Sequence, residues 1–174
     1  MKQSLESVVA LSRQYCDLIE GCTVADQRWL ASLARLFPRL KIAVEALDHC
    51  GDPVETSLVP DLDARFELFV ELMGLLGEND AYWQPFDRTG DRQSMTGSLA
   101  DDLTDIYCEL KHALQWWEIQ PEKTPSVLCF SYRRHWKQHL QDAKRHLDVL
   151  LQSRQMPSPP QRGRTGWRPV ALVG

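Results

Sequence analysis

The 174-residue sequence contains no long hydrophobic run. Its apolar stretches fall short of the roughly 18 to 20 residues that a membrane-spanning helix needs. The first residues, from Met1 to Glu6, also lack the uninterrupted apolar core of a secretory signal. We therefore expect a soluble cytoplasmic protein with no membrane association.

Cysteine is scarce and follows no pairing pattern. There are five cysteines, an odd number, and no two of them form a C-x-x-C pair. This spacing excludes a disulfide framework and a zinc ribbon. We expect a reducing compartment, in which Cys16 and Cys108 are small buried hydrophobic side chains.

The sequence also lacks an excess of positive charge. Its net charge is −4, whereas a general binder of nucleic acid or anionic membrane needs a basic surface. The exception is residues 154–174, called the tail below, which hold four arginines, four prolines and no acid. We expect two parts: a helical bundle domain at residues 1–153, and a basic tail that is extended or docks on a partner.

Apolar residues recur at spacings of three and four along most of the chain, as amphipathic helices require. The length suits one domain. We therefore predict an all-α fold, a single bundle of about five helices, because no strand pattern of alternating apolar residues competes with the helical spacing. The expected helices cover residues 4–21, 26–47 with a kink or restart at Pro38, 61–76, 98–118 and 127–153. A long polar loop with three aromatic residues fills residues 77–97.

Acidic residues and histidines form the most specific pattern, on the last two expected helices. Asp102, Asp105 and Glu109 line one face of the fourth helix, followed at the same spacing by His112. His135 and His139 share a face of the fifth. Such facing sets build metal sites in bundles, and imidazole with carboxylate suits zinc, iron or manganese.

A buried polar network that holds the two helices in register would use the same residues without any metal. Separations far above about 5 Å would exclude a shared site. No H-E-x-x-H motif is present, and we assign no catalytic residue.

Two weaker patterns point to other chemistry. The acids at residues 101–105 look like half of the magnesium site of all-α nucleoside-triphosphate pyrophosphatases, but the E-x-x-E helix that completes that site is missing. Arg134 and His139 match the Arg-x4-His spacing of one class of helical ribonucleases, at a spacing that often arises by chance.

Aromatic residues and the tail are the candidates for contact with a partner. Tryptophan and tyrosine are frequent at the centres of interfaces. Adjacent tryptophans on a helix point about 100° apart, so one of Trp116 and Trp117 should pack and the other should lie at the rim. The predicted contact residues are Tyr82, Trp83, Phe86, Trp116, Arg162, Arg164, Trp167 and Arg168.

Three segments carry a resemblance to a known family. They read YWQPFD at residues 82–87, LADDLTDIYCELK at 99–111 and HWKQH at 135–139. In this order they resemble the motifs of the bacterial domain of unknown function 5063, and residues 15–20 are similar to that family's opening. The sequence differs at Lys137, where the family has glycine, and at Glu109, where it has aspartate.

The resemblance covers residues 4 to about 150 and leaves out the tail. It implies a helical fold and groups Asp102, Asp105, His135 and His139 as a unit, without implying an activity.

The leading hypothesis is a non-enzymatic accessory or adaptor protein that binds another protein and has no cofactor. The first alternative is a metal-binding helical hydrolase or sensor that uses the carboxylates and histidines of the last two helices. The second is a nucleic-acid-associated accessory protein, which would use the arginines of the tail together with Arg133, Arg134, Lys137, Lys144 and Arg145. The sequence leaves the oligomeric state open.

Overall fold

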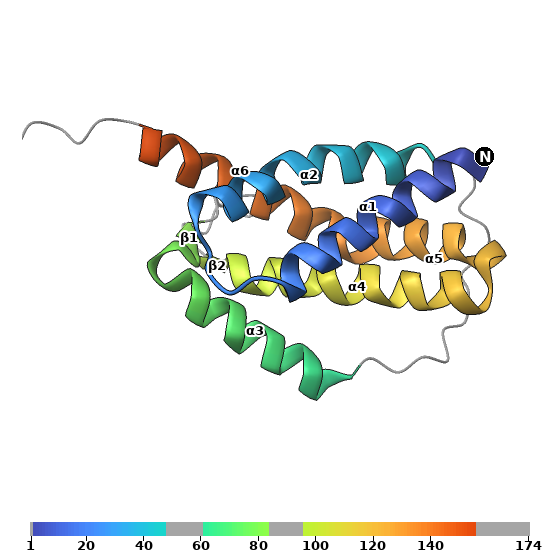
Figure 1. Ribbon diagram of the computed structural model, residues 1–174, viewed down its shortest axis with the longest axis horizontal. Helices are drawn as coiled ribbons and strands as arrows, with labels where there is room; N and C mark the ends of the chain where they lie inside the picture. Colours follow the sequence, from blue (N-terminus) through green and yellow to red (C-terminus); the bar gives the residue numbers. More distant parts are fainter. Residues whose placement is uncertain (1, 48–60, 84–95, 156–174) are drawn as a thin grey trace, which may run out of the picture.

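The computed structural model describes residues 2–47, 61–83 and 96–155. Long α-helices dominate these ranges (Figure 1). In chain order they are α1 (Lys2–Glu20), α2 (Gln27–Glu45), α3 (Leu62–Leu76), α4 (Leu99–Ile119), α5 (Thr124–Ser131) and α6 (Lys137–Gln155). Short 3-10 turns, η1 (Gly77–Asn79) and η2 (Pro121–Lys123), follow α3 and precede α5. The predicted all-α bundle is confirmed.

Helices α1, α2, α4 and α6 form the bundle, and α3 packs on the outside of α4. The core consists of side chains at helical spacing, such as Leu33 and Phe37 of α2 and Leu103 and Ile106 of α4. In the core, the Tyr15 hydroxyl donates to the backbone oxygen of Leu103 at 2.8 Å. Because α4 contacts α1, α3, α5 and α6, side chains on different faces of α4 reach several neighbours.

Parts of the expected polar loop at residues 77–97 form two short strands. Strands β1 (Ala81–Trp83) and β2 (Thr96–Ser98) pair antiparallel, with Tyr82 opposite Gly97. Three-residue strands are too short to show the alternation by which strands are recognised in a sequence. β2 leads directly into α4, so the sheet lies at the N-terminal end of that helix.

The expected fifth helix is one continuous run of α5, a π-helical turn η3 (Tyr132–Trp136) and α6. The backbone N–H of Lys137 donates to the oxygen of Tyr132, five residues earlier. Such turns insert an extra residue and are frequent at functional sites. Earlier in the chain, α2 continues through Pro38 instead of restarting there. α6 runs to Gln155, two residues past the expected end of the bundle domain.

Cys16 and Cys22 are buried and free, Cys129 is buried, and Cys108 is free and half-buried. Burial raises the pKa of the Cys16 thiol to about 12, so this thiol stays protonated and behaves as a small apolar group. None of the helices in the described ranges has the length and hydrophobicity to cross a membrane.

Candidate metal centre

Helix α4 begins at a closely held N-terminus. The Ser98 hydroxyl accepts the backbone N–H of Asp101, and the Asp80 carboxylate accepts the backbone N–H of Ala100 at 2.7 Å. A carboxylate at this end also interacts favourably with the helix dipole. These contacts fix the first turns of α4, from which the candidate site is built.

Asp105 lies nearly two turns into α4 and is held on one side by a residue of α3. The Arg65 side chain donates twice to Oδ1 of Asp105, from Nε at 2.8 Å and from Nη2 at 2.5 Å. Nη2 also donates to Asp101 at 3.0 Å. The Asp105 side chain is only 8% exposed, so the guanidinium compensates a buried charge and leaves Oδ2 for another partner.

Asp102 is also buried, and both of its oxygens accept hydrogen bonds. The Tyr82 hydroxyl donates to Oδ2 at 2.5 Å, and Nδ1 of His139 lies 2.8 Å from Oδ1. Burial raises the pKa of Asp102, and the hydrogen bond to Asp102 in turn raises the pKa of His139. The contact therefore ties α6 to the start of α4.

His135 and His139 have the same arrangement. Nδ1 of His135 lies 2.9 Å from Oε1 of Glu109, and Nδ1 of His139 lies 2.8 Å from Oδ1 of Asp102. An ionised carboxylate only accepts hydrogen bonds, so each Nδ1 carries the proton. Each Nε2 is turned toward Oδ2 of Asp105, at 3.3 Å for His139 and 3.8 Å for His135.

Asp105, His135 and His139 each offer one ligand atom to a common point. The three ligand atoms all lie within 4.8 Å of one another. Two ligands bound about 2.1 Å from one zinc ion at a tetrahedral angle lie about 3.4 Å apart, close to the observed separation of His139 and Asp105. His135 is 47% exposed and His139 25%, so one side of the cluster is open to solvent.

The π-turn brings these histidines to the cluster. His135 lies within the turn and His139 follows it in α6. Their rings are 5.1 Å apart, centre to centre, and nearly perpendicular. On the inner side of the same turn, the indole N–H of Trp136 donates to the Ser131 hydroxyl at 2.9 Å. The buried tryptophan therefore anchors the turn that presents the histidines.

A cavity of about 350 Å³ adjoins the cluster. Its walls come from β1, β2, α3, α4 and α6, and two residues of the network, Asp102 and His139, form part of them. The remaining lining residues are Phe69, Tyr82, Thr96, Gly97, Ser98, Asp101, Gln138 and Asp142. A small molecule in this cavity would lie beside His139.

The other histidines of the two helices, and Arg134, have partners outside the cluster. His112 does not join the acids that precede it, because its Nε2 accepts the indole N–H of Trp116 at 3.0 Å. His146 stacks on Tyr82 and contacts the backbone oxygen of Asn79 at 2.7 Å. Arg134 lies over the ring of Phe130, 5.2 Å from its centre.

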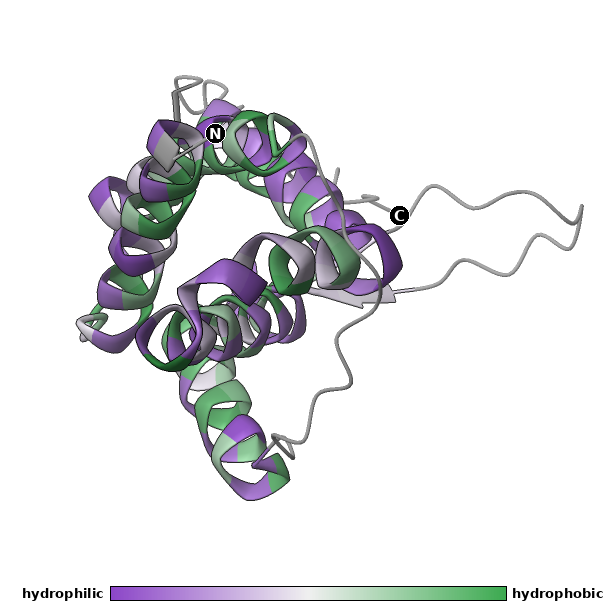
Figure 2. Ribbon diagram, turned by 90° about the vertical axis from the view of Figure 1, so that its right-hand side faces the viewer, coloured by the Kyte–Doolittle hydropathy of each residue, from purple (hydrophilic) through white to green (hydrophobic). Residues whose placement is uncertain are grey.

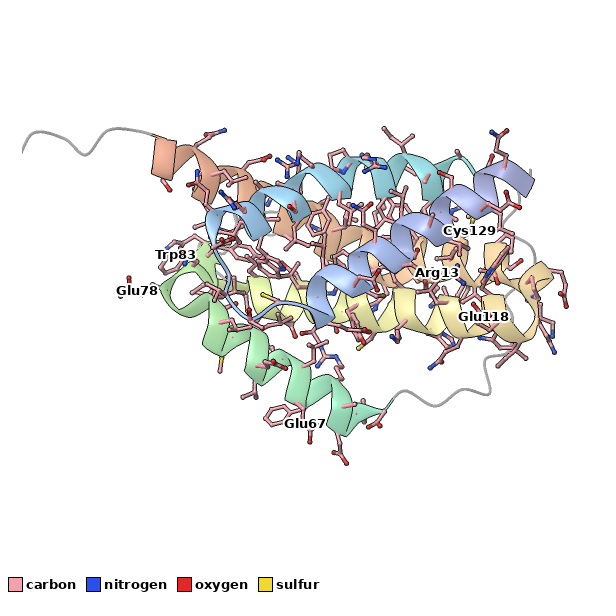
Figure 3. The ribbon with its side chains drawn as sticks, viewed as in Figure 1. Arg13, Glu67, Glu78, Trp83, Glu118 and Cys129 are labelled. Atoms are coloured by element: carbon pink, nitrogen blue, oxygen red, sulfur yellow. The ribbon has the colours of Figure 1, made fainter. Side chains whose placement is uncertain are left out.

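The predicted contact residues divide into three groups. Tyr82 and Trp116 are 9% and 7% exposed, because Tyr82 belongs to the Asp102 network and Trp116 packs in the core. Their role in partner contact stays a prediction. Trp83 is 71% exposed at the end of β1 (Figure 3). Phe86, Arg162, Arg164, Trp167 and Arg168 lie outside the residues that the structure describes.

Sequence reasoning missed two members of the network. Arg65 is 40 residues from Asp105 along the chain, and nothing marked it except that it is the only base in α3. Gly97 falls within the expected loop, but a Cβ atom there would lie 2.3 Å from the ring of Tyr82. Only glycine leaves room for that ring above β2.

The comparison with known families decides the family of this chain. The model of the family described as domain of unknown function, DUF5063, matches residues 1–153. The chain belongs to this family. In this chain, the segments at residues 99–111 and 135–139 supply all five residues of the carboxylate and histidine cluster described above: Asp102, Asp105, Glu109, His135 and His139.

A solved relative shares the fold of this DUF5063 chain. The crystal structure of protein BF1032 from Bacteroides fragilis superposes with a TM-score of 0.68 at 19% sequence identity. The match covers 91% of this chain and 96% of that chain. At this identity the likeness shows the fold alone. No curated protein sequence matches the chain.

Proposed function

We propose that this DUF5063 protein binds a divalent transition-metal ion, of the class of zinc, through Nε2 of His135, Nε2 of His139 and Oδ2 of Asp105. The observation that carries the proposal is the direction of the two rings. Both histidines use Nδ1 for a carboxylate and turn Nε2 toward the same oxygen of Asp105.

This orientation of the two rings is unfavourable when Nε2 holds neither a proton nor a metal ion. A neutral imidazole that carries its proton on Nδ1 has a lone pair on Nε2. Two such lone pairs then face a carboxylate oxygen, and acceptors that face one another repel. A proton on an imidazole removes part of this repulsion, and a divalent cation removes it for both histidines at once.

The surrounding residues match the support that metal ligands have in proteins. Ligating histidines usually donate their second N–H to a carboxylate, which fixes the ring and makes the free nitrogen more basic. Asp102 is the carboxylate that accepts from His139, and Glu109 is the one that accepts from His135. Arg65 holds the other oxygen of Asp105, so Asp105 would bind the metal through one oxygen.

Three protein ligands with an open side are typical of catalytic rather than structural zinc. The metal would supply Lewis acidity and would lower the pKa of a bound water, which is the chemistry of a hydrolase. The cavity beside His139 would admit a substrate or an effector. The metal site therefore favours the hydrolase or sensor alternative over a purely structural role.

Metal binding is tested with protein stripped by a chelator. Calorimetric titration with Zn²⁺ should give one site, and the melting temperature should rise when the metal is added. His139→Gln and Asp105→Asn should abolish both effects. His112→Gln is the matched control, since its ring lies outside the cluster, and it should bind as the wild type does. Absence of heat and of any melting shift in the wild type would refute the proposal.

Binding to another protein is the second candidate, and exposed Trp83 supports it. A large aromatic side chain that is 71% exposed at a sheet edge is the residue type that anchors interfaces. Affinity capture that compares the full chain with Trp83→Ala should lose a partner in the variant, and identical captures would count against this residue. Nucleic-acid binding rests on the arginines of the tail and stays a prediction.

A further inference from the structure

Helix α3 carries an apolar stripe on the side that faces away from the bundle. The stripe consists of Leu62, Phe66, Val70 and Met73, which follow one another at helical spacing and are 71%, 61%, 43% and 41% exposed. The ten large hydrophobic side chains that are exposed in the described ranges include these four. An exposed stripe of this kind marks a contact surface.

The opposite side of α3 already has its partners. Leu72 and Leu76 are buried against the bundle, and Arg65 reaches Asp105 of α4. Figure 2 shows α3 as the lowest helix, at the edge of the molecule, with hydrophobic and hydrophilic residues along it. The stripe is therefore a second hydrophobic face, separate from the face that packs on α4.

Acidic residues run along one edge of the stripe. Asp63, Glu67 and Glu71 are four residues apart and exposed, so they form a row beside the apolar side chains. Figure 3 shows Glu67 on the outer side of α3. Since Arg65 turns to Asp105, this row has no basic neighbour from α3 itself. The surface favours an occupant that is both apolar and basic.

The tail of the same chain has this composition. Arg162, Arg164 and Arg168 lie beside Trp167, the apolar run at residues 170–173 follows, and the tail has no acid. The tryptophan and the apolar run can cover the stripe, and the arginines can face the acidic row. Charge and hydrophobicity are therefore complementary between α3 and the end of the chain.

The chain length allows this contact within one molecule. His146 contacts Asn79, three residues after the end of α3, so α6 passes close to that end. Gln155 follows nine residues later, about 14 Å further along the helix. The 12 residues from 156 to 167 span up to about 40 Å when extended. This span is enough to cover the roughly 14 Å back to the end of α3 and the length of roughly 22 Å of this 15-residue helix.

We propose that residues 162–173 dock on the α3 stripe of their own chain, with Trp167 and residues 170–173 against Phe66 and Val70, and with the arginines along Asp63, Glu67 and Glu71. This contact is independent of the metal site, since it uses the face of α3 that points away from Asp105.

Trypsin cleavage of the full-length protein after Arg162 and Arg164, followed by mass spectrometry, tests the docking. The double variant Phe66→Asn/Val70→Asn removes the centre of the stripe. Its matched control is Ile42→Asn, which changes a side chain that is 68% exposed on α2. Circular dichroism checks that all three proteins are folded. Cleavage tracks the undocked population when docking is fast, so the double variant should be cut at least about five-fold faster than the wild type and the control.

Two further measurements complete the test. Trp167→Ser in the tail should raise the cleavage rate as the double variant does, and moderate salt should raise the rate in the wild type, because it screens the arginine contacts. Equal cleavage rates in wild type and double variant would overturn the proposal. Protection that grows with protein concentration would also overturn it, because the occupant would then be the tail of a second copy.

Discussion

The hydroxyl of Tyr82 lies 2.5 Å from Oδ2 of Asp102, although 20 residues separate them in the chain. The contact fastens strand β1 to the first turn of α4. It also gives a hydrogen-bond donor to a carboxylate oxygen that is buried away from water. Because the other oxygen of Asp102 holds His139, the tyrosine also supports the position of that ring.

Tyr82→Phe removes this hydroxyl and keeps the ring. It should lower the free energy of unfolding by about 1.5 to 3 kcal/mol, the range for a hydrogen bond to a charged group. Urea denaturation measures the change. Trp83→Phe, at the exposed neighbouring position, should stay within about 0.5 kcal/mol of the wild type. Equal effects of the two variants would show that the hydroxyl contributes nothing.

Gly97→Ala tests the space that Tyr82 needs. The added methyl group would lie 2.3 Å from the ring, so the ring has to leave its place and the bond to Asp102 is lost. The loss of stability should be at least as large as in Tyr82→Phe. Gly74→Ala is the control, because a methyl group there meets nothing within 4 Å. It should stabilise α3 by up to about 1 kcal/mol, as thermal unfolding would show.

Arg65→Gln leaves the buried Asp105 without its guanidinium. The expected loss is about 1 to 3 kcal/mol of unfolding free energy, since an unsatisfied buried acceptor is costly. Arg13→Gln makes the same chemical change in the exposed pair of Arg13 with Glu118 (Figure 3), whose side chains are 52% and 69% exposed. That pair should contribute at most about 1 kcal/mol. If both variants lost the same stability, Arg65 would be an ordinary surface arginine.

The stability of the metal-free protein should fall as the pH rises from neutral to mildly alkaline values. The hydrogen bond to Asp102 raises the pKa of His139 above its ordinary value of 6.5. The folded state therefore holds this proton more tightly than the unfolded state. The resulting stabilisation is complete below about pH 6.5 and is lost as the pH rises through the folded pKa.

Melting temperatures of chelator-treated protein between about pH 5.5 and 8.5 measure this loss. His139→Gln should remove the decline. His112 gives a contrast within the same protein, because burial lowers its pKa and its contribution is lost as the pH falls. A wild-type profile parallel to that of His139→Gln would contradict the assignment to His139.

Glu109→Gln tests the support of a metal ligand without removing the ligand. The amide still accepts the N–H of His135 but has no charge, so Nε2 becomes less basic. Zinc affinity should fall about 10- to 100-fold, the usual cost of losing such a partner. Calorimetry measures it, with Glu118→Gln on the exposed end of α4 as the control. Unchanged affinity in Glu109→Gln would separate Glu109 from the site.

The sequence predicted the bundle and most of the cluster because helical spacing is a strong local signal. In a helix over residues 98–118, the spacing places Asp102, Asp105 and Glu109 on one face. It places His135 and His139 on one face of the last helix in the same way. The resemblance to the family implied that the two faces act as a unit. Which acid binds which histidine depends on the distance between the packed helices and on their rotation. The spacing of residues in the sequence determines neither of these.

Arg65 and Tyr82 could not be placed for the same reason. Each reaches the cluster from an element distant in sequence, across contacts that only the packed bundle defines. The aromatic ring of Tyr82 suggests a contact residue, and nothing in the neighbouring sequence indicates that its hydroxyl binds the buried Asp102. The two short strands were missed since their pairing, and not their composition, makes them strands.

The π-turn at residues 132–136 reconciles two periodicities of one long helix. Leu128, Tyr132, Trp136 and Leu140 are buried at steps of four residues, and each such step in an α-helix turns the side chain about 40° further around the axis. Three steps would carry Leu140 about 120° away from the face on which Leu128 packs. The wider turn absorbs this drift. Deleting one residue from it would rotate α6 as a whole, so the hydrophobic register of the bundle and the direction of His139 would be lost together.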